Sequence, residues 1–366
     1  MYKVPQFIPY VGHDEWEAME TCFTSQWITE GPKTEEFTEA LADKLGVKHV
    51  VLAPNGTLAL YLGLRALGIG PGDGVIVPDF TMVASANAVE MTGATPVFVD
   101  VECEHCQIDV DRINILTGNV KAIMPVHMYG MAADMSKVCN YANKHNLFII
   151  EDAAQAFGVT WDDKPCGSFG HIGCFSLFAD KTITTGEGGF VCTNSDHGYE
   201  QLLYLRNQGR LNRGTFVHPH IGYNFRMTDM QSAMGLAQLA KLDEIIERKR
   251  QIMHIYMNSL RSVRQIKFTI QHYKSNYIPF RTSFTSEALA SDVIKHLAKD
   301  GIEARTYFYP LHKQPCYHGQ YAAEMGWDYD WNSMWLYEHG LCLPSFISIT
   351  SEQIELVCKS LRSFYA

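Results

Sequence analysis

The chain has 366 residues, 46% hydrophobic and 19% charged, which is long enough to build two domains with substantial cores. Its formal net charge of −10, with no run of basic residues, excludes a general nucleic-acid binder, because such proteins neutralise phosphates with clustered Lys and Arg. No apolar stretch reaches the roughly 18 residues of a membrane span, and residues 1–12 lack the features of a signal peptide. We therefore expect a cytoplasmic protein with no membrane partner.

The ten cysteines are scattered through predicted core segments, which favours free thiols over a disulfide framework. Cys103 and Cys106 have the spacing of a zinc or redox pair. No second pair lies near them in the sequence, and they follow a strand in a polar loop, so we predict no metal site.

A predicted strand at His49–Ala53 leads into a helix that runs through Leu67. Asn55 or Thr57 can cap this helix. Backbone N–H groups at a helix start, beside a glycine such as Gly56 that allows close approach, form an anion site that suits a phosphate. A plain capped helix would have the same sequence, so the pattern alone leaves both interpretations open.

Further strands are predicted at 75–78, 96–99, 121–126 and 148–151, alternating with helical segments. This alternation, with about 20 to 30 residues per unit, predicts a mostly parallel sheet covered by helices on both faces. His127 and Asp152 follow two of these strands, at the sheet edge where open α/β sheets bind ligands. A buried carboxylate needs a partner. His127 is a candidate site residue, although a structural role is nearly as compatible with its position.

An apolar run at 173–179 reads as a buried strand that we expect to end at a single lysine, Lys181. A threonine- and glycine-rich turn and a short strand at Phe190–Cys192 follow. Apolar surroundings disfavour the ammonium form and release a nucleophilic amine near neutral pH. Lys181 is thus a candidate for Schiff-base chemistry, although most lysines are solvated surface charges.

The last hundred residues change character, because short strand-like pieces alternate with helices at 286–299 and 351–364. This pattern predicts a smaller α+β domain. Between these helices, the segment Ile302–Tyr317 is dense in aromatic, His and Arg groups and includes Tyr309 and His312. Such groups suit stacking and hydrogen bonding to a sugar or base, although a packed interdomain loop would have a similar composition.

The segments that deliver Asp152 and Lys181 together resemble the DegT/DnrJ/EryC1/StrS family of sugar aminotransferases, and the resemblance covers nearly the whole chain, from Trp27 to Ser345. It implies the type I fold of the pyridoxal 5'-phosphate (PLP)-dependent aspartate aminotransferases. We expect a large α/β domain (1–245), with a mostly parallel seven-stranded sheet, and a smaller C-terminal α+β domain (246–366). The implied cofactor is PLP and the implied amino donor is L-glutamate. The implied acceptor is a nucleotide-linked 4-keto-6-deoxy sugar. Among the members of the family, those that use a GDP-linked sugar resemble this chain the most.

The resemblance also carries the family's site residues over to this chain. Lys181 would hold the cofactor and move the proton, Asp152 would pair with the pyridinium nitrogen, and Gln155 would bond the ring hydroxyl. The phosphate would be held by Gly56, Thr57 and Ser176, together with Asn224 of the partner subunit, which implies a homodimer with shared active sites. The expected substrate contacts are Trp27, His127, Arg226, Tyr309 and His312.

Met82 is a departure from the family pattern, because relatives usually carry there an aromatic residue that stacks on the cofactor ring. A thioether can still lie against a π-face. Its contact surface is smaller and more flexible, so we expect weaker cofactor retention than in relatives with Tyr or Trp.

Several alternatives stay open. The acceptor could be a dTDP- or UDP-linked keto sugar aminated at C3 or C4, because the choice depends on pocket contacts worth only ~1–3 kcal/mol each. A sugar 3-dehydratase would carry a histidine in place of Lys181. A non-catalytic regulatory protein of the same fold would be expected to lack some of Lys181, Asp152, Ser176 and Asn224, and all four are present.

Overall fold

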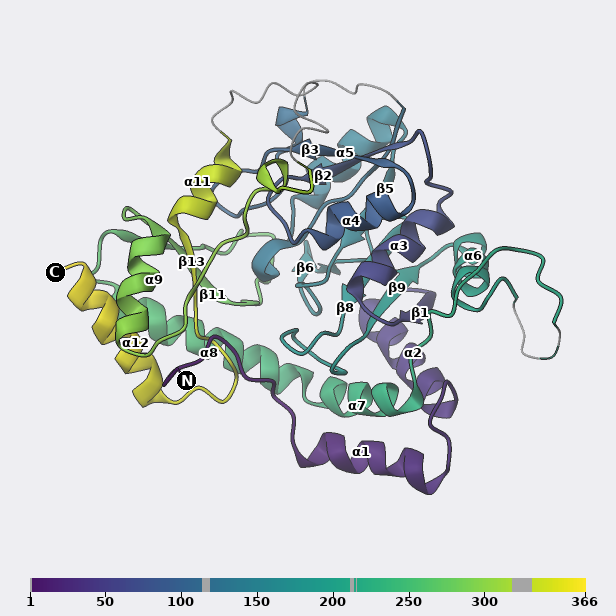
Figure 1. Ribbon diagram of the computed structural model, residues 1–366, viewed down its shortest axis with the longest axis horizontal. Coiled ribbons are helices and arrows are strands. Elements are labelled where there is room, and N and C mark those ends of the chain that lie inside the picture. Colours follow the sequence, from purple (N-terminus) through teal and green to yellow (C-terminus); the bar gives the residue numbers. More distant parts are fainter. Residues whose placement is uncertain (1, 114–118, 211–213, 215, 318–330) are drawn as a thin grey trace.

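In the computed structural model the chain forms two lobes, which lie side by side above one pair of consecutive helices (Figure 1). The structure describes residues 2–113, 119–210, 214, 216–317 and 331–366. The larger lobe is built on a seven-stranded sheet and the smaller on a four-stranded sheet. Among the described helices, none has the length and apolar character needed to cross a membrane.

The large sheet has the strand order β1-β9-β8-β5-β4-β2-β3. Its neighbouring strands are parallel except for the two pairs that involve β9. This confirms the predicted mostly parallel seven-stranded sheet. The strands are β1 (His49–Ala53), β2 (Gly74–Pro78), β3 (Thr95–Val99), β4 (Val120–Ile123), β5 (Phe148–Asp152), β8 (Ile172–Ser176) and β9 (Gly189–Thr193).

Every residue of β2 and β9 is buried, as expected for strands that helices cover on both faces. The helices of this lobe are α1 (His13–Thr24), α2 (Pro32–Leu45), α3 (Gly56–Ala66), α4 (Ala84–Met91), α5 (Met135–His145), α6 (Asp196–Arg206) and α7 (Asp229–Ala240). The 3-10 turns η1 (Val110–Arg112) and η2 (Met128–Gly130) and the hairpin β6 (Thr160–Trp161) and β7 (Lys164–Pro165) complete it.

The smaller lobe has an antiparallel sheet in the order β10-β11-β13-β12. Its strands are β10 (Ile266–Phe268), β11 (Thr282–Ser286), β12 (Arg305–Thr306) and β13 (Gly340–Leu343), and its other elements are α9 (Ala290–Lys299), η3 (Leu311–Lys313), α11 (Asn332–His339) and α12 (Ser351–Phe364). The helix α8 (Leu242–Leu260) continues from α7 into this lobe (Figure 1). The expected domain division between 245 and 246 therefore falls inside α8.

The start of the chain belongs to the smaller lobe and not, as the expected boundaries placed it, to the larger one. Val4 is fully buried in the core of the smaller lobe, and it forms a parallel bridge with Ile302. Gln6 donates from its side chain to the Leu343 carbonyl at 3.2 Å. Burial of the Val4 and Gln6 side chains holds this N-terminal segment against the smaller lobe. The chain then crosses to α1, which lies below α7 (Figure 1).

Candidate active site

Lys181 lies in a turn, five residues beyond the end of its strand. The expectation that the strand runs up to Lys181 is wrong, because β8 stops at Ser176. Beyond it the backbone turns: the Lys181 N–H donates to the Phe178 carbonyl at 2.9 Å, and the Leu177 N–H donates to the Gly188 carbonyl at 2.8 Å. These bonds close a loop that holds the lysine at the carboxyl edge of the sheet.

The Lys181 amine is largely enclosed. Its side chain is 15% exposed, and Nζ lies 4.7 Å from the centroid of the Phe280 ring and 4.0 Å from Oδ1 of Asp180. Burial lowers the pKa of Lys181, although the charges of Asp180 and Asp152 oppose the shift. A lysine of lowered pKa holds more of its amine in the neutral, nucleophilic form at neutral pH.

Asp152 ends the neighbouring parallel strand β5 and is 4% exposed. Its Oδ2 accepts a hydrogen bond from Oγ of Ser85 at 2.7 Å, and its Oδ1 accepts from the Ala154 N–H at 3.1 Å. Burial raises the pKa of Asp152, while the Ser85 and Ala154 hydrogen bonds and the nearby Lys181 charge oppose the rise. A cation that enters the site would therefore meet a buried, oriented carboxylate.

The start of α3 faces the end of β8. Asn55 caps the helix, since its Oδ1 accepts from the Leu58 N–H at 2.9 Å. A Cβ on Gly56 would lie 2.8 Å from Cβ of Ser176, so only glycine permits this approach. The first N–H groups of α3, including that of Thr57, thus lie beside the Ser176 hydroxyl. Helix dipole and free donors together suit an anion such as a phosphate.

Gln155 and Met82 flank this region. Gln155 is buried, and its Oε1 accepts from the Tyr129 N–H at 2.8 Å, which fixes the orientation of the amide. Met82 follows β2 just before α4 and is 50% exposed. Because the Met82 side chain is flexible and half exposed, neighbouring residues do not hold its thioether in one orientation.

Two expected substrate contacts are buried and already engaged. His127 is fully buried: its Nε2 lies 3.0 Å from Oε2 of Glu151, and its Nδ1 accepts from the Ala133 N–H at 3.1 Å. His312 is 4% exposed, and its Nδ1 lies 2.6 Å from Oδ2 of Asp79. Both histidines are thus held by buried carboxylates in the core, and their contact with the substrate stays a prediction.

Replacing Glu151 with alanine should lower the free energy of unfolding by about 3–5 kcal/mol. This carboxylate is fully buried and accepts from the N–H groups of Gly167, Phe169 and Gly170 at 2.6–2.7 Å, in addition to His127. Its removal would leave these buried donors without an acceptor. Urea unfolding measures the change, with the exposed Glu104→Ala as a control, and a loss below about 1 kcal/mol would contradict the structural role.

The other expected contacts are exposed to varying degrees. Trp27 is 45% exposed and donates from Nε1 to the Glu30 carbonyl at 3.1 Å, and Tyr309 is 37% exposed and packs edge-on against Tyr337. Asn224 is exposed, and its Oδ1 accepts from Nε of Arg226 at 3.0 Å. Beside it, the loop that follows α6 extends away from the body of the molecule (Figure 1). Within one chain, these four side chains do not line the cavity beside Lys181.

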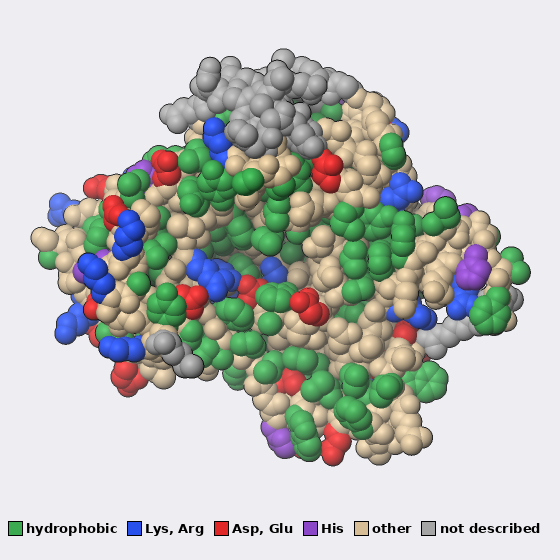
Figure 2. Space-filling model, viewed as in Figure 1, with side chains coloured by type: hydrophobic (Ala, Val, Ile, Leu, Met, Phe, Trp, Pro, Cys, Tyr) green, Lys and Arg blue, Asp and Glu red, His purple; other side chains and the backbone are tan. Residues whose placement is uncertain are grey.

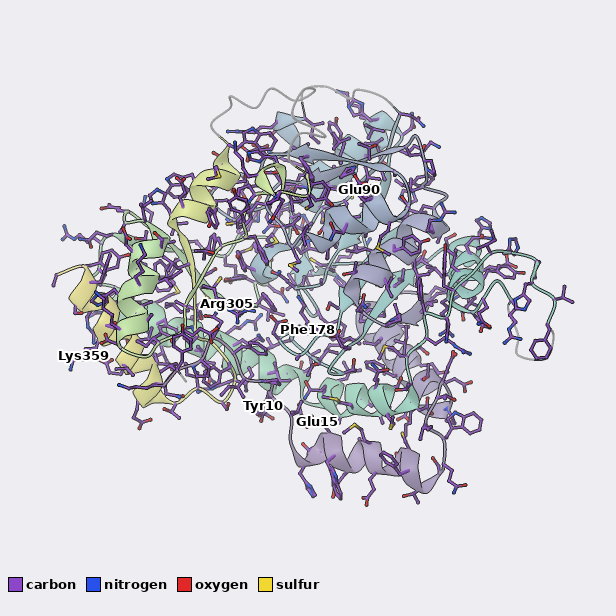
Figure 3. All side chains as sticks on the ribbon, viewed as in Figure 1. Tyr10, Glu15, Glu90, Phe178, Arg305 and Lys359 are labelled. Atoms are coloured by element: carbon purple, nitrogen blue, oxygen red, sulfur yellow. The ribbon has the colours of Figure 1, made fainter. Side chains whose placement is uncertain are left out.

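That cavity has a volume of about 40 Å³ and lies between the lobes. Its walls come from the crossing N-terminal segment (Gln6 to Tyr10), from the Lys181 turn, from α7 and α8, from the two residues just before β11 and from residues 345–347. Figure 2 shows a hollow on this face with basic and acidic side chains beside it, and Figure 3 labels Tyr10, one of the residues that line the cavity.

Sequence patterns gave no signal for several side chains around Lys181 and Asp152. Asp180, Lys249, Phe280 and Arg281 surround the amine, and Ser85 orients the carboxylate. They come from segments far apart in the chain and form no short motif, so only the folded contacts reveal them.

Comparisons with known proteins identify the family of this chain. The model of the DegT/DnrJ/EryC1/StrS aminotransferase family matches residues 9–362. A GDP-perosamine synthase of Escherichia coli O157:H7 is 40% identical over 377 aligned positions that cover 100% of both chains, and one of Vibrio cholerae is 36% identical with 99% of both chains covered. The crystal structure of a DegT/DnrJ/EryC1/StrS aminotransferase from Brucella abortus superposes with a TM-score of 0.87 at 30% identity, covering 96% of this chain and 95% of that one.

Proposed function

The chain belongs to the DegT/DnrJ/EryC1/StrS aminotransferase family, and we propose that it is a PLP-dependent transaminase that moves an amino group from L-glutamate to GDP-4-keto-6-deoxy-mannose, giving GDP-perosamine. One observation carries the proposal. An enclosed lysine, Lys181, follows the strand that pairs with the strand ending in the buried carboxylate of Asp152, in a chain that matches GDP-perosamine synthases along its whole length. We place this reaction in the cytoplasm.

The residues present fit PLP. Gly56 leaves room beside Ser176 that a Cβ would fill, so the N–H groups of Gly56 and Thr57 and the Ser176 hydroxyl can hold the cofactor phosphate. Asp152 can pair with the pyridinium nitrogen, and Gln155 can bond the ring hydroxyl. Met82 would lie against the ring face. When bound, PLP supplies an electron sink that stabilises negative charge at the carbon losing its proton.

The remaining chemistry falls to side chains of the chain itself. The Lys181 amine would hold the cofactor covalently between turnovers, and once the donor's amino group has replaced it, the freed amine would act as the general base that takes the α-proton of L-glutamate and then as the general acid that gives it up. In the second half of the reaction Lys181 moves a proton in the opposite direction. Asp152 keeps its charge next to the ring nitrogen throughout, which requires that it stay ionised. Trp27, Arg226 and Tyr309 remain the proposed contacts with the nucleotide sugar.

We also propose a homodimer with shared sites, in which Asn224 of the partner subunit completes the phosphate cradle. Two features support this. Asn224 is exposed on a segment beside a loop that leaves the body of its own chain, and Phe216 and Ile221 of that loop are 87% and 84% exposed. Exposed apolar side chains of this size favour association with another surface.

The activity test combines purified protein, L-glutamate and the GDP-4-keto-6-deoxy sugar, and follows 2-oxoglutarate and the aminated sugar by mass spectrometry. We expect both products in equal amounts. The dTDP- and UDP-linked 4-keto-6-deoxy sugars are run in parallel. Turnover with one of these instead of the GDP sugar would correct the substrate but keep the transaminase, and a protein that binds no PLP would refute the proposal.

A further inference from the structure

Four charged or ionisable side chains meet around one aromatic ring at the junction of the lobes. Lys181 Nζ, Arg281 Cζ and Lys249 Nζ lie 4.7, 5.1 and 5.8 Å from the centroid of Phe280. The carboxylate of Asp180 lies among them: its Oδ2 accepts from Nη2 of Arg281 at 2.5 Å, and its Oδ1 is 4.0 Å from Lys181 Nζ. Hereafter these four side chains are called the junction cluster.

Positive groups outnumber negative ones in the junction cluster. The arginine is always charged and engages the carboxylate directly, and Oδ1 of Asp180 is buried without a hydrogen-bond partner in the structure. Lys249 is 8% exposed and donates to the Phe280 carbonyl at 3.3 Å, and no carboxylate of the described residues forms an ion pair with it. Lys181 and Lys249 therefore both lie near the Asp180 carboxylate, which already forms an ion pair with Arg281.

The physical consequence follows from the cost of buried charge. Three cationic side chains in an enclosed site are disfavoured where only two carboxylates, those of Asp180 and Asp152, act on Lys181, so the lysine amines tend to lose their protons. Burial and then the Arg281 charge lower the pKa of Lys249 to about 8, and burial and Arg281 also lower the pKa of Lys181. The other groups facing Lys181 are Asp180 and Asp152, which favour its charged form, and the Tyr10 hydroxyl on the cavity wall donates to Glu244.

We propose that Arg281 and Lys249 are positioning residues for the reaction: Arg281 engages Oδ2 of the Asp180 carboxylate, and Arg281 and Lys249 together add positive charge around Phe280, which favours the neutral, nucleophilic form of the Lys181 amine. The inference rests on the proposed function, since it assigns these residues a purpose only if Lys181 is the nucleophile. It also couples the lobes, because Lys181 belongs to the larger lobe, Arg281 to the smaller and Lys249 to α8 between them.

The test measures the reactivity of the Lys181 amine against pH in the full-length protein freed of cofactor. Limiting acetic anhydride acetylates neutral amines, and mass spectrometry quantifies the Lys181 peptide relative to the exposed Lys295. Reactivity rises with pH through the pKa of the amine, so a variant that raises this pKa moves the profile to higher pH. Circular dichroism of each variant checks that it is folded.

In Arg281→Met the Asp180 carboxylate loses its partner and becomes free to stabilise the Lys181 ammonium. We expect the profile to move up by about one pH unit, which makes acetylation at pH 7 about tenfold slower. Lys249→Met should move it in the same direction by less. Asp180→Asn should move it the opposite way, to lower pH. Arg281→Lys, which keeps the charge, should restore most of the wild-type profile.

The matched control is Arg305→Gln, which removes an arginine of the same lobe that pairs with Glu303 instead (Figure 3). Coincident profiles for Arg281→Met and Arg305→Gln would overturn the inference, and so would a shift of Asp180→Asn in the same direction as Arg281→Met. Because acetylation needs no cofactor and no turnover, these outcomes are separate from failure of the proposed function, which would appear as a wild-type protein that does not bind PLP.

Discussion

Lys181→Ala should lose transamination by at least about a thousandfold in kcat, because one amine serves as nucleophile and as proton carrier in both halves of the reaction. The measurement is release of 2-oxoglutarate from L-glutamate with the GDP-linked keto sugar. The variant should also no longer be locked to the cofactor by borohydride, because the amine that carries the cofactor has been removed. Lys295→Ala, which removes an exposed lysine of α9, should leave the rate unchanged. Retention of more than about a tenth of the activity would exclude Lys181 as the nucleophile.

A mixing experiment uses the same variant to test the shared site. A hybrid dimer that combines one Lys181→Ala subunit with one Asn224→Ala subunit has a single complete site if each site takes Asn224 from the partner subunit. Isolated with two affinity tags, the hybrid should recover about half of the wild-type activity, although both parent homodimers are impaired. If each site used Asn224 of its own chain, both sites of the hybrid would be defective and activity would not recover.

Asp152→Asn should lower kcat by roughly a hundred- to a thousandfold with little effect on folding. The amide keeps the shape of the side chain, and its oxygen can still accept one of the two hydrogen bonds that Ser85 and Ala154 donate to Asp152. It carries no charge, so it cannot hold the ring nitrogen of the cofactor in its protonated form. The measurement is the single-turnover rate with L-glutamate at saturating PLP. An unchanged rate would show that the electron sink does not depend on this carboxylate.

The pH profile gives a second check on Asp152. Burial raises its pKa and the Ser85 hydrogen bond opposes the rise, so the required ionised form is lost as pH falls through this pKa. Removal of the hydroxyl in Ser85→Ala takes away one opposing contact and raises the pKa further. The acid limb of the single-turnover profile should therefore move to higher pH in Ser85→Ala, whereas a merely structural Ser85 would lower the amount of folded protein without moving the limb.

Much of the large lobe could be predicted because its signals are local. The buried runs of β2 and β5 and the cap at Asn55 depend on neighbouring residues alone. Parallel strands separated by helices also have few ways to connect, so the sheet edge that carries Asp152 and the segment of Lys181 followed from strand alternation. The strand pattern did not predict which nitrogen, hydroxyl or carboxylate each of these side chains contacts.

The sequence by itself determined the strand series, the capped helix beside a glycine, and the placement of one aspartate and one lysine after strands at the carboxyl edge of a mostly parallel sheet. Only the tertiary structure decided that His127 and His312 are committed to buried carboxylates, that Val4 packs in the smaller lobe, and that Arg281 reaches Asp180 across 101 positions of the chain. The physical reason is the range of the interactions. Strand patterns and caps are set by residues a few positions apart, whereas the charge environment of a buried amine is the sum over every group that folding brings near it.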